Sequence, residues 1–119
     1  MSSIGIDIIE IQRIDSAIKR WGGRFLGRIY TQTELELCGG RTSSLAARFA
    51  AKEAVMKVLG TGAKGVGWRE IEILADSAGK PLIKLHDQAR VKAKELNLNE
   101  FSVSLSDTEQ YAIAAAIGT

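Results

Sequence analysis

The feature that most constrains the fold is a nearly continuous apolar helical segment, RFAAKEAVMKVLGTG, which runs from Arg48 to Gly62. Its residues are strong helix formers and its last glycines are a stop signal, so a helix is predicted over roughly residues 44–59. The hydroxyl groups of residues 42–44, Thr-Ser-Ser, are expected to cap its first turn. A long helix of this composition is expected to form the centre of the fold.

The charged residues of this helix fall on two narrow stripes, because successive side chains are about 100° apart. Arg48 and Lys52 form one stripe, and Glu53 and Lys57 form the other. A Glu–Lys pair four residues apart can be an ordinary surface pair that stabilises a helix by about 0.2–0.5 kcal/mol. The same side of the helix also carries apolar residues, namely Ala46, Phe49 and Ala50. The second stripe is therefore interpreted as facing a lined pocket.

Periodicity along the chain predicts one α+β domain over residues 1–119, in which a mainly antiparallel sheet packs against the long helix. Strands are expected at residues 4–9, 68–74, 81–85, 101–105 and 111–117, and helices at residues 11–21, 25–29, 31–38, 44–59 and 87–96. The first strand is expected to be buried on both faces, since it is rich in isoleucine. A capping box is expected at Thr31 and Glu34.

Composition excludes several classes of protein. Sixteen basic against fourteen acidic residues give a net charge of +2, which disfavours a general nucleic-acid binder. The lone Cys38 and the lone His86 exclude an internal disulfide and a zinc site built from such residues, and they favour a reducing cytoplasm. We expect no signal peptide and no membrane span. His86 precedes a predicted helix, so it is expected to be structural or to cap that helix.

Two further segments carry groups suited to chemistry. Asp7 interrupts the apolar first strand, where it either caps a backbone amide or serves a metal or catalytic site. The segment GTGAKGVGW, residues 60–68, either connects helix and strand or exposes backbone amides to an anion. It is not a Walker loop. A strand acid, a helix acid, a lysine and this loop together suit magnesium shared with a diphosphate, because magnesium commonly takes only one or two carboxylates.

These residues resemble a known family. The motifs are Gly5-Ile-Asp7 with Glu10 and Arg13, then RFAAKEAVMK, and then Gly60-Thr-Gly62. They resemble the holo-acyl carrier protein synthases, the small-subunit class of 4'-phosphopantetheinyl transferases, over nearly the whole chain. The resemblance implies a magnesium enzyme of fatty acid biosynthesis. It would move the 4'-phosphopantetheine arm of coenzyme A onto a serine of apo acyl carrier protein and release adenosine 3',5'-bisphosphate.

The resemblance also implies roles for individual residues. Asp7 and Glu53 would be the metal ligands, and Lys57 would neutralise the diphosphate, so that all three are catalytic. Nucleotide-holding residues are expected at Arg48, Lys57, Gly60, Gly62, Lys64 and Gly65. The acceptor of the serine proton stays open between Glu53 and a metal-bound water. A homotrimer with active sites between subunits is implied, which fits a chain too small for a deep cleft of its own.

One position departs from the family: Asp107 follows Ser106 where a histidine is usual. An acid there would either join the water shell of the metal or repel phosphate. A noncatalytic carrier-binding module of the same fold is therefore the alternative function, and a small nucleotide or nucleic-acid binder is disfavoured.

A basic segment is the expected partner surface. Arg13, Arg20 and Arg24 lie in a segment that holds a single acid between residues 11 and 28. A run of charge is usually a solvated helix face. Acyl carrier proteins are acidic, and the resemblance places carrier contacts on the helix that begins at residue 11. These arginines are therefore expected to dock the carrier.

Overall fold

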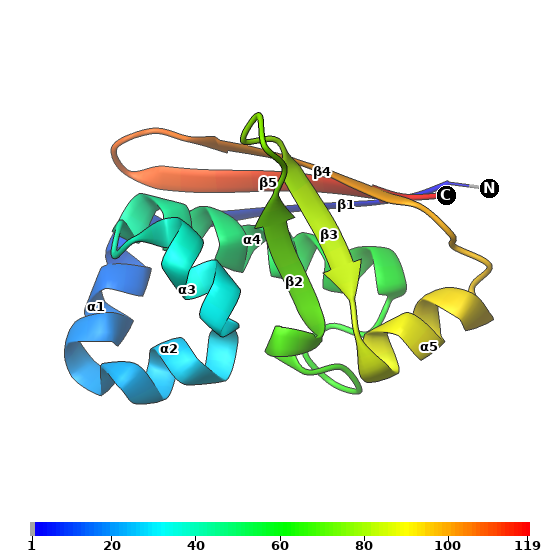
Figure 1. Cartoon of the computed structure of the whole chain (residues 1–119), viewed down its shortest axis with the longest axis horizontal. Coiled ribbons are helices and arrows are strands. Elements are labelled where there is room, and N and C mark those ends of the chain that lie inside the picture. The colour runs from blue at the N-terminus through cyan, green and yellow to red at the C-terminus, as the bar shows by residue number, and fades with distance from the viewer. Residues whose placement is uncertain (1) are drawn as a thin grey trace.

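The computed structural model describes residues 2–119, and its longest helix lies beneath a three-stranded antiparallel sheet (Figure 1). The helices are α1 (Ile11–Trp21), α2 (Gly23–Ile29), α3 (Gln32–Cys38), α4 (Thr42–Leu59) and α5 (Asp87–Glu95), with a 3-10 turn η1 (Trp68–Glu70). The strands are β1 (Ser3–Glu10), β2 (Ile71–Ala75), β3 (Pro81–Leu85), β4 (Phe101–Asp107) and β5 (Tyr111–Gly118). The sheet order is β1-β5-β4, and β2 and β3 form a separate antiparallel hairpin. The predicted α+β class is confirmed.

At the two ends of α4, the stop predicted from the sequence is present and the predicted N-terminal caps are not. Gly60 follows the helix in the left-handed conformation at φ 73°, so the predicted stop is confirmed. The predicted caps are wrong, because α4 begins at Thr42, directly after Arg41, and no side chain caps it. Residues 42–44 lie inside its first turn instead. Another boundary also shifts: Trp68 begins the η1 turn, and β2 begins only at Ile71.

Strand β1 approaches α4 closely, because small residues line the contact. Helix α4 packs chiefly on β1 and β5. Buried alanines are Ala46, Ala50 and Ala54 of α4 and Ala112, Ala114 and Ala116 of β5. At Gly5 of β1 an added Cβ would overlap the carbonyl oxygen of Ala54. Only glycine fits there, and the backbone of β1 rests directly on that of α4.

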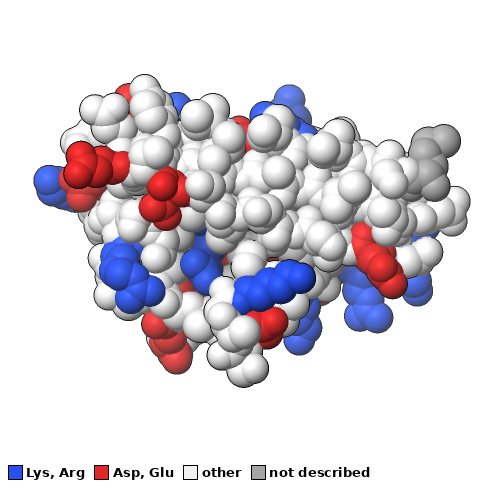
Figure 2. Space-filling model, turned by 90° about the horizontal axis from the view of Figure 1, so that it is seen from above, with Lys and Arg blue, Asp and Glu red and all other residues white. Residues whose placement is uncertain are grey.

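The prediction that β1 is buried on both faces is wrong. Ile4, Ile6 and Ile8 are 73%, 57% and 60% exposed, whereas Ile9 is buried. Alternate residues of a strand point to opposite faces, and in this chain α4 covers only one face of the sheet. Figure 2, which views the molecule from above, shows the outer face as largely uncharged. Asp7 belongs to the inner set with Gly5 and Ile9.

The Arg48–Lys52 stripe of α4 faces α3 and β2, and its lysine is completely buried. Lys52 Nζ lies 2.8 Å from Glu34 Oε1, and neither side chain is exposed. The same ammonium donates to the carbonyl oxygens of Trp68 (3.0 Å) and Ile71 (2.6 Å). Burial lowers the pKa of Lys52, and the charge of Glu34 opposes that change. A buried ion pair persists only when its remaining hydrogen-bonding groups are satisfied, and these three contacts satisfy the ammonium.

The carboxylate oxygens of Glu34 also have hydrogen-bond donors. Its Oε1 accepts from the backbone N–H of Thr31, and its Oε2 accepts from the N–H of Ile73, both at 2.8 Å. The capping box predicted at Thr31 and Glu34 is confirmed. Its glutamate also holds α3 against α4 and β2. The buried Lys52–Glu34 pair is therefore structural.

The contact at Gly5 gives the first prediction. Gly5→Ala is expected to destabilise the fold by about 3 kcal/mol or more, because two backbones must separate to admit the methyl group. Urea unfolding measures this loss. Gly27→Ala in α2 is the matched control, since an added Cβ there meets nothing within 4 Å. The control is expected to be neutral or to stabilise by up to about 1 kcal/mol. Equal stability of the two variants would contradict the close contact.

Candidate functional site

The second charged stripe of α4 meets Asp7 of β1. Lys57 Nζ lies 3.3 Å from Asp7 Oδ1 and donates to the carbonyl oxygen of Ile6 at 2.7 Å. Glu53 lies one turn before Lys57 on the same helix. The side chain of Asp7 is 14% exposed and that of Lys57 is 54% exposed. The structure thus brings together the strand acid, the helix acid and the lysine at a site that solvent can reach.

The charge of Asp7 disfavours ionisation of Glu53. Burial, followed by the nearby charge of Asp7, raises the pKa of Glu53 above its ordinary value. Lys57 and Arg13 act in the opposite direction. Two carboxylates whose charges are coupled in this way supply hard oxygen ligands for a small divalent cation, which would relieve their repulsion. The residues present therefore fit magnesium.

The chain supplies only part of a coordination shell. Across residues 2–119, no group of three or more His, Cys, Asp and Glu side chains is arranged to hold a metal ion. With two protein carboxylates, the remaining ligands of an octahedral ion would be water and substrate oxygens. Such a site suits a metal that is bound together with a phosphorylated substrate.

A cavity of about 280 Å³ opens beside these acids, between β1, α1, α2 and α4. Its polar lining residues are Asp7, Arg13 and Glu53, and its apolar ones are Ile8, Ile9, Ile14, Ala17, Phe25 and Phe49. Phe49 stacks on Trp68 with ring centroids 4.6 Å apart. The cavity therefore has a charged end beside the acids and an aromatic wall that extends to the η1 turn.

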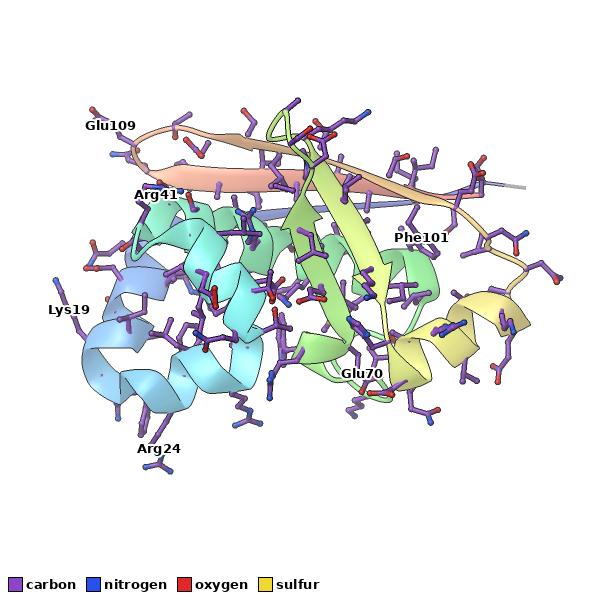
Figure 3. All side chains as sticks on the ribbon, viewed as in Figure 1. Lys19, Arg24, Arg41, Glu70, Phe101 and Glu109 are labelled. Carbon is purple, nitrogen blue, oxygen red and sulfur yellow. The ribbon has the colours of Figure 1, made fainter. Side chains whose placement is uncertain are left out.

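The glycine-rich loop begins at Gly60, directly after the last residue of α4 and three residues after Lys57. Gly60, Gly62 and Gly65 have left-handed φ values of 73°, 57° and 85°, a conformation in which glycine is favoured. Lys64 in this loop is exposed. At the far end, Glu70 Oε2 accepts from the N–H of Gly67, and Glu70 Oε1 accepts from the N–H of Ala89. Figure 3 shows Glu70 between the η1 turn and α5. Both ends of the loop are thus fixed.

Two other predicted residues lie away from the acids. Arg48 Nε donates to the carbonyl oxygen of Ile73 at 3.1 Å, and Arg48 is not among the residues that line the cavity. Asp107 ends β4 opposite Ala112, so β5 lies between it and β1. Within one chain, the structure therefore places neither residue with Asp7 and Glu53.

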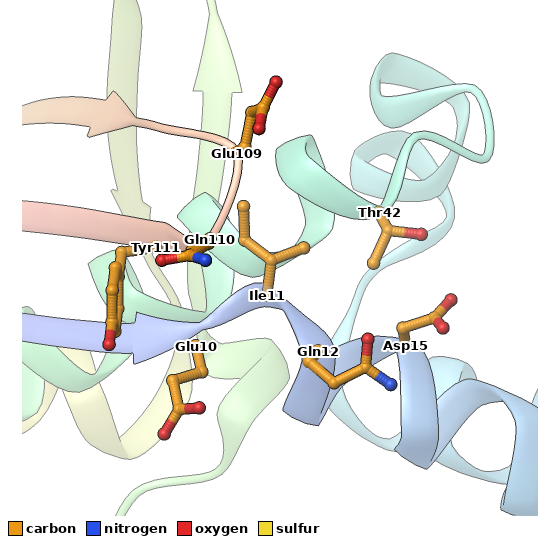
Figure 4. Close-up of a pocket in the computed structure, with 8 residues that line it drawn as sticks. All are labelled: Glu10, Ile11, Gln12, Asp15, Thr42, Glu109, Gln110 and Tyr111. Atoms are coloured by element: carbon orange, nitrogen blue, oxygen red, sulfur yellow. The ribbon is translucent and has the colours of Figure 1, made fainter.

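A second cavity, of about 450 Å³, lies where β1 meets α1 (Figure 4). It is lined by Glu10, Ile11, Gln12, Asp15, Thr42, Glu109, Gln110 and Tyr111. Among the residues that the structure describes, it has three carboxylates and no basic side chain. That lining repels a diphosphate, so this cavity is a poor candidate for a nucleotide site.

The predicted basic surface contains an aromatic residue that sequence reasoning missed. Arg20 lies over the ring of Trp21, 5.0 Å from its centroid, and Trp21 is 50% exposed. Trp21, Arg24, Phe25 and Arg28 line a cavity of about 540 Å³. Figure 3 shows Arg24 projecting away from the body of the molecule. The available signal was a tryptophan among arginines, directly before the glycine that ends α1.

Comparisons with known proteins agree with this geometry. A model of the 4'-phosphopantetheinyl transferase superfamily matches residues 3–116. A holo-acyl-carrier-protein synthase of Herpetosiphon aurantiacus is 49% identical, with 96% of this chain and 95% of the relative covered. One from Dehalococcoides mccartyi is 52% identical, with 95% and 94% covered. The crystal structure of the Helicobacter pylori enzyme in complex with coenzyme A has a TM-score of 0.90 and 36% identity, with 98% and 99% covered.

The chain therefore belongs to the 4'-phosphopantetheinyl transferase superfamily and, within it, to the holo-acyl-carrier-protein synthases. The resemblance drawn from the motifs is confirmed, and so is the transferase class. Within residues 2–119, no helix has the length and apolarity needed to span a bilayer.

Proposed function

We propose that this chain transfers the 4'-phosphopantetheine arm of coenzyme A to a serine of apo acyl carrier protein, with magnesium, in fatty acid biosynthesis. The observation that carries the proposal is the convergence of Asp7, Glu53 and Lys57 beside one cavity. Two comparisons support it: the relatives are named for this synthesis, and the Helicobacter pylori structure contains coenzyme A. The second product is adenosine 3',5'-bisphosphate.

Asp7 and Glu53 are the residues that would hold the magnesium ion. When bound, the ion would polarise the diphosphate and neutralise charge that develops on it. Lys57 places its ammonium beside the same acids, where it can pair with a phosphate oxygen of coenzyme A. We also propose that Gly60, Gly62, Lys64 and Gly65 hold the nucleotide, through backbone N–H groups and the exposed ammonium. For Arg48 the same role requires it to change partners, because it already donates to Ile73.

The transfer is a substitution at phosphorus. A bond forms between the serine oxygen of the carrier and the β-phosphorus of coenzyme A. The bond from that phosphorus to the bridging oxygen breaks, and adenosine 3',5'-bisphosphate leaves with the electron pair. The serine proton must also leave, and Glu53 is the candidate acceptor within the chain. The apolar wall at Phe25 and Phe49 limits the access of water, which would otherwise compete with the serine.

We further propose a homotrimer with active sites between subunits. Its support is the outer face of the sheet, where Ile4, Ile6, Ile8 and Ile117 are exposed side by side in β1 and β5. Exposed apolar patches of this kind mark association surfaces. In such an assembly, Arg48 or Asp107 could face the site of a neighbouring subunit. The buried free thiol of Cys38 is consistent with a cytoplasmic location.

The function is tested by incubating the protein with coenzyme A, magnesium and an apo carrier, and then weighing the carrier by mass spectrometry. Asp7→Ala and Glu53→Ala are each expected to lower the transfer rate by more than about 100-fold, because each removes a proposed metal ligand. Glu36→Ala is the matched control, since Glu36 is an exposed glutamate on α3, and its rate should equal that of the wild type. Carrier binding without any mass increase in the wild type would instead support the noncatalytic module.

We propose that the carrier docks on Arg13, Arg20 and Arg24, with Trp21 as an apolar anchor between them. Arg24 and Trp21 line the same cavity, and Arg20 packs on the ring of Trp21. Exposed charges steer an acidic partner and are screened by salt, whereas an aromatic contact acts through buried area. The two kinds of contact should therefore respond differently to ionic strength.

The docking surface gives a prediction about salt. Arg24→Ala is expected to raise KM for the carrier about fivefold at low salt, and the difference should largely vanish at about 0.5 M salt, where charges are screened. Trp21→Ala should raise the same KM about fivefold or more at both salt concentrations. Lys94→Ala, an exposed lysine on α5, is the control and should change nothing. Carrier kinetics that are unaltered in both test variants would remove this surface from docking.

A further inference from the structure

The buried ammonium of Lys52, which has no role in the proposed reaction, connects α4 to the end of the glycine-rich loop. Lys52 donates to the carbonyl oxygens of Trp68 and Ile71, the residues at the start of η1 and directly after it. Its third partner is Glu34, which also holds Ile73 of β2. Lys52 therefore attaches α4 to both sides of the turn in which the loop ends.

Between its two ends, the loop has little to fix its shape. Across the described chain, the backbone N–H groups of residues 62–66 donate no intrachain hydrogen bond. The last contact on the helical side is the N–H of Thr61 with the carbonyl oxygen of Met56 (3.2 Å). The first contact on the strand side is Gly67 with Glu70 (2.8 Å). The position of the free N–H groups thus depends on where the two ends are held.

Those ends are held relative to the same helix. Lys52 precedes Glu53 directly and lies five residues before Lys57 on α4. Trp68, whose carbonyl Lys52 holds, also stacks on Phe49, which lines the cavity beside the acids. Because a helix is rigid over one or two turns, any shift of η1 relative to Lys52 is a shift of the loop relative to the acids and to Lys57.

We propose that Lys52 is a positioning residue for coenzyme A. By fastening η1 to α4, it sets the place of loop residues 62–66 relative to Lys57, Asp7 and Glu53. This inference rests on the proposed role of the loop in holding the nucleotide. It assigns Lys52 no contact with substrate. This tether between η1 and α4 therefore controls the affinity for coenzyme A and leaves the carrier surface on α1 and α2 unaffected.

The experiment compares variants that differ in this tether. Lys52→Met removes the ammonium but leaves the carboxylate of Glu34 buried without its partner. If urea unfolding shows that this variant does not fold, the double variant Lys52→Met/Glu34→Gln replaces it, because it leaves no unpaired charge inside. Tyr30→Phe is the matched control: it deletes another buried hydrogen bond to α4, from Tyr30 Oη to the carbonyl oxygen of Leu45, and leaves η1 untouched.

The first readout follows the turn itself. The chain has two tryptophans, so in a Trp21→Phe background the fluorescence comes from Trp68 alone. Loss of the tether is expected to increase acrylamide quenching of Trp68 about twofold or more and to accelerate amide hydrogen exchange in residues 67–71. The Tyr30→Phe control should leave both quantities at their wild-type values. Unchanged quenching and exchange in the tether variant would overturn the proposal.

The second readout is the affinity for coenzyme A with magnesium, measured by calorimetry. The tether variant is expected to bind about tenfold more weakly, because the loop must be ordered on binding. KM for the carrier should stay within about twofold. A loosened Trp68 with unchanged affinity, or the same loss of affinity in Tyr30→Phe, would overturn the positioning role. Absence of transfer by the wild type would instead overturn the proposed function, and the calorimetry would still decide the role of Lys52.

Discussion

The contact between the backbones of β1 and α4 determines the rest of the structure. At Gly5 the strand lies so close to the carbonyl of Ala54 that no side chain fits between them. Asp7 is two residues further along the same face of β1, so this contact delivers its carboxylate to Lys57 and to the side of α4 that carries Glu53. A bulkier residue at position 5 would move the strand acid away from both helix residues.

The two charged stripes of α4 have different physical roles, although they look alike in the sequence. Lys52 is buried with Glu34 and two backbone carbonyl groups, and the Lys52–Glu34 pair joins α3, α4 and β2. Glu53 lines a cavity together with Asp7 of β1, and Lys57 pairs with that aspartate. Lys52 stabilises the packing of α3, α4 and β2, and this packing supports the side of α4 on which Glu53 and Lys57 can bind a charged ligand. Lys52 also holds the η1 turn, in which the glycine-rich loop ends.

Local signals predicted most of the elements, because helix formers, capping boxes and glycines act within a few residues. The box at Thr31 and the stop at Gly60 are examples. The errors arise where the outcome depends on distant residues. In β1, isoleucines alternate with Gly5, Asp7 and another isoleucine, so the pattern does not show which face stays uncovered. The burial of Lys52 depends on an acid 18 residues earlier. The residue types indicated Asp7, Glu53 and Lys57 as candidates, and the motif resemblance assigned their roles. Asp7 and Lys57 are 50 residues apart, so no local signal could place them together.

Asp7 and Glu53 are proposed to hold one divalent ion together. Manganese, which is visible by electron paramagnetic resonance, can stand in for magnesium in a binding titration with coenzyme A present. The wild type should bind one ion per chain, and Asp7→Asn and Glu53→Gln should each weaken the binding of that same ion by about tenfold or more. Two ions per chain, of which each variant loses a different one, or a single variant that binds as tightly as the wild type, would contradict the shared site.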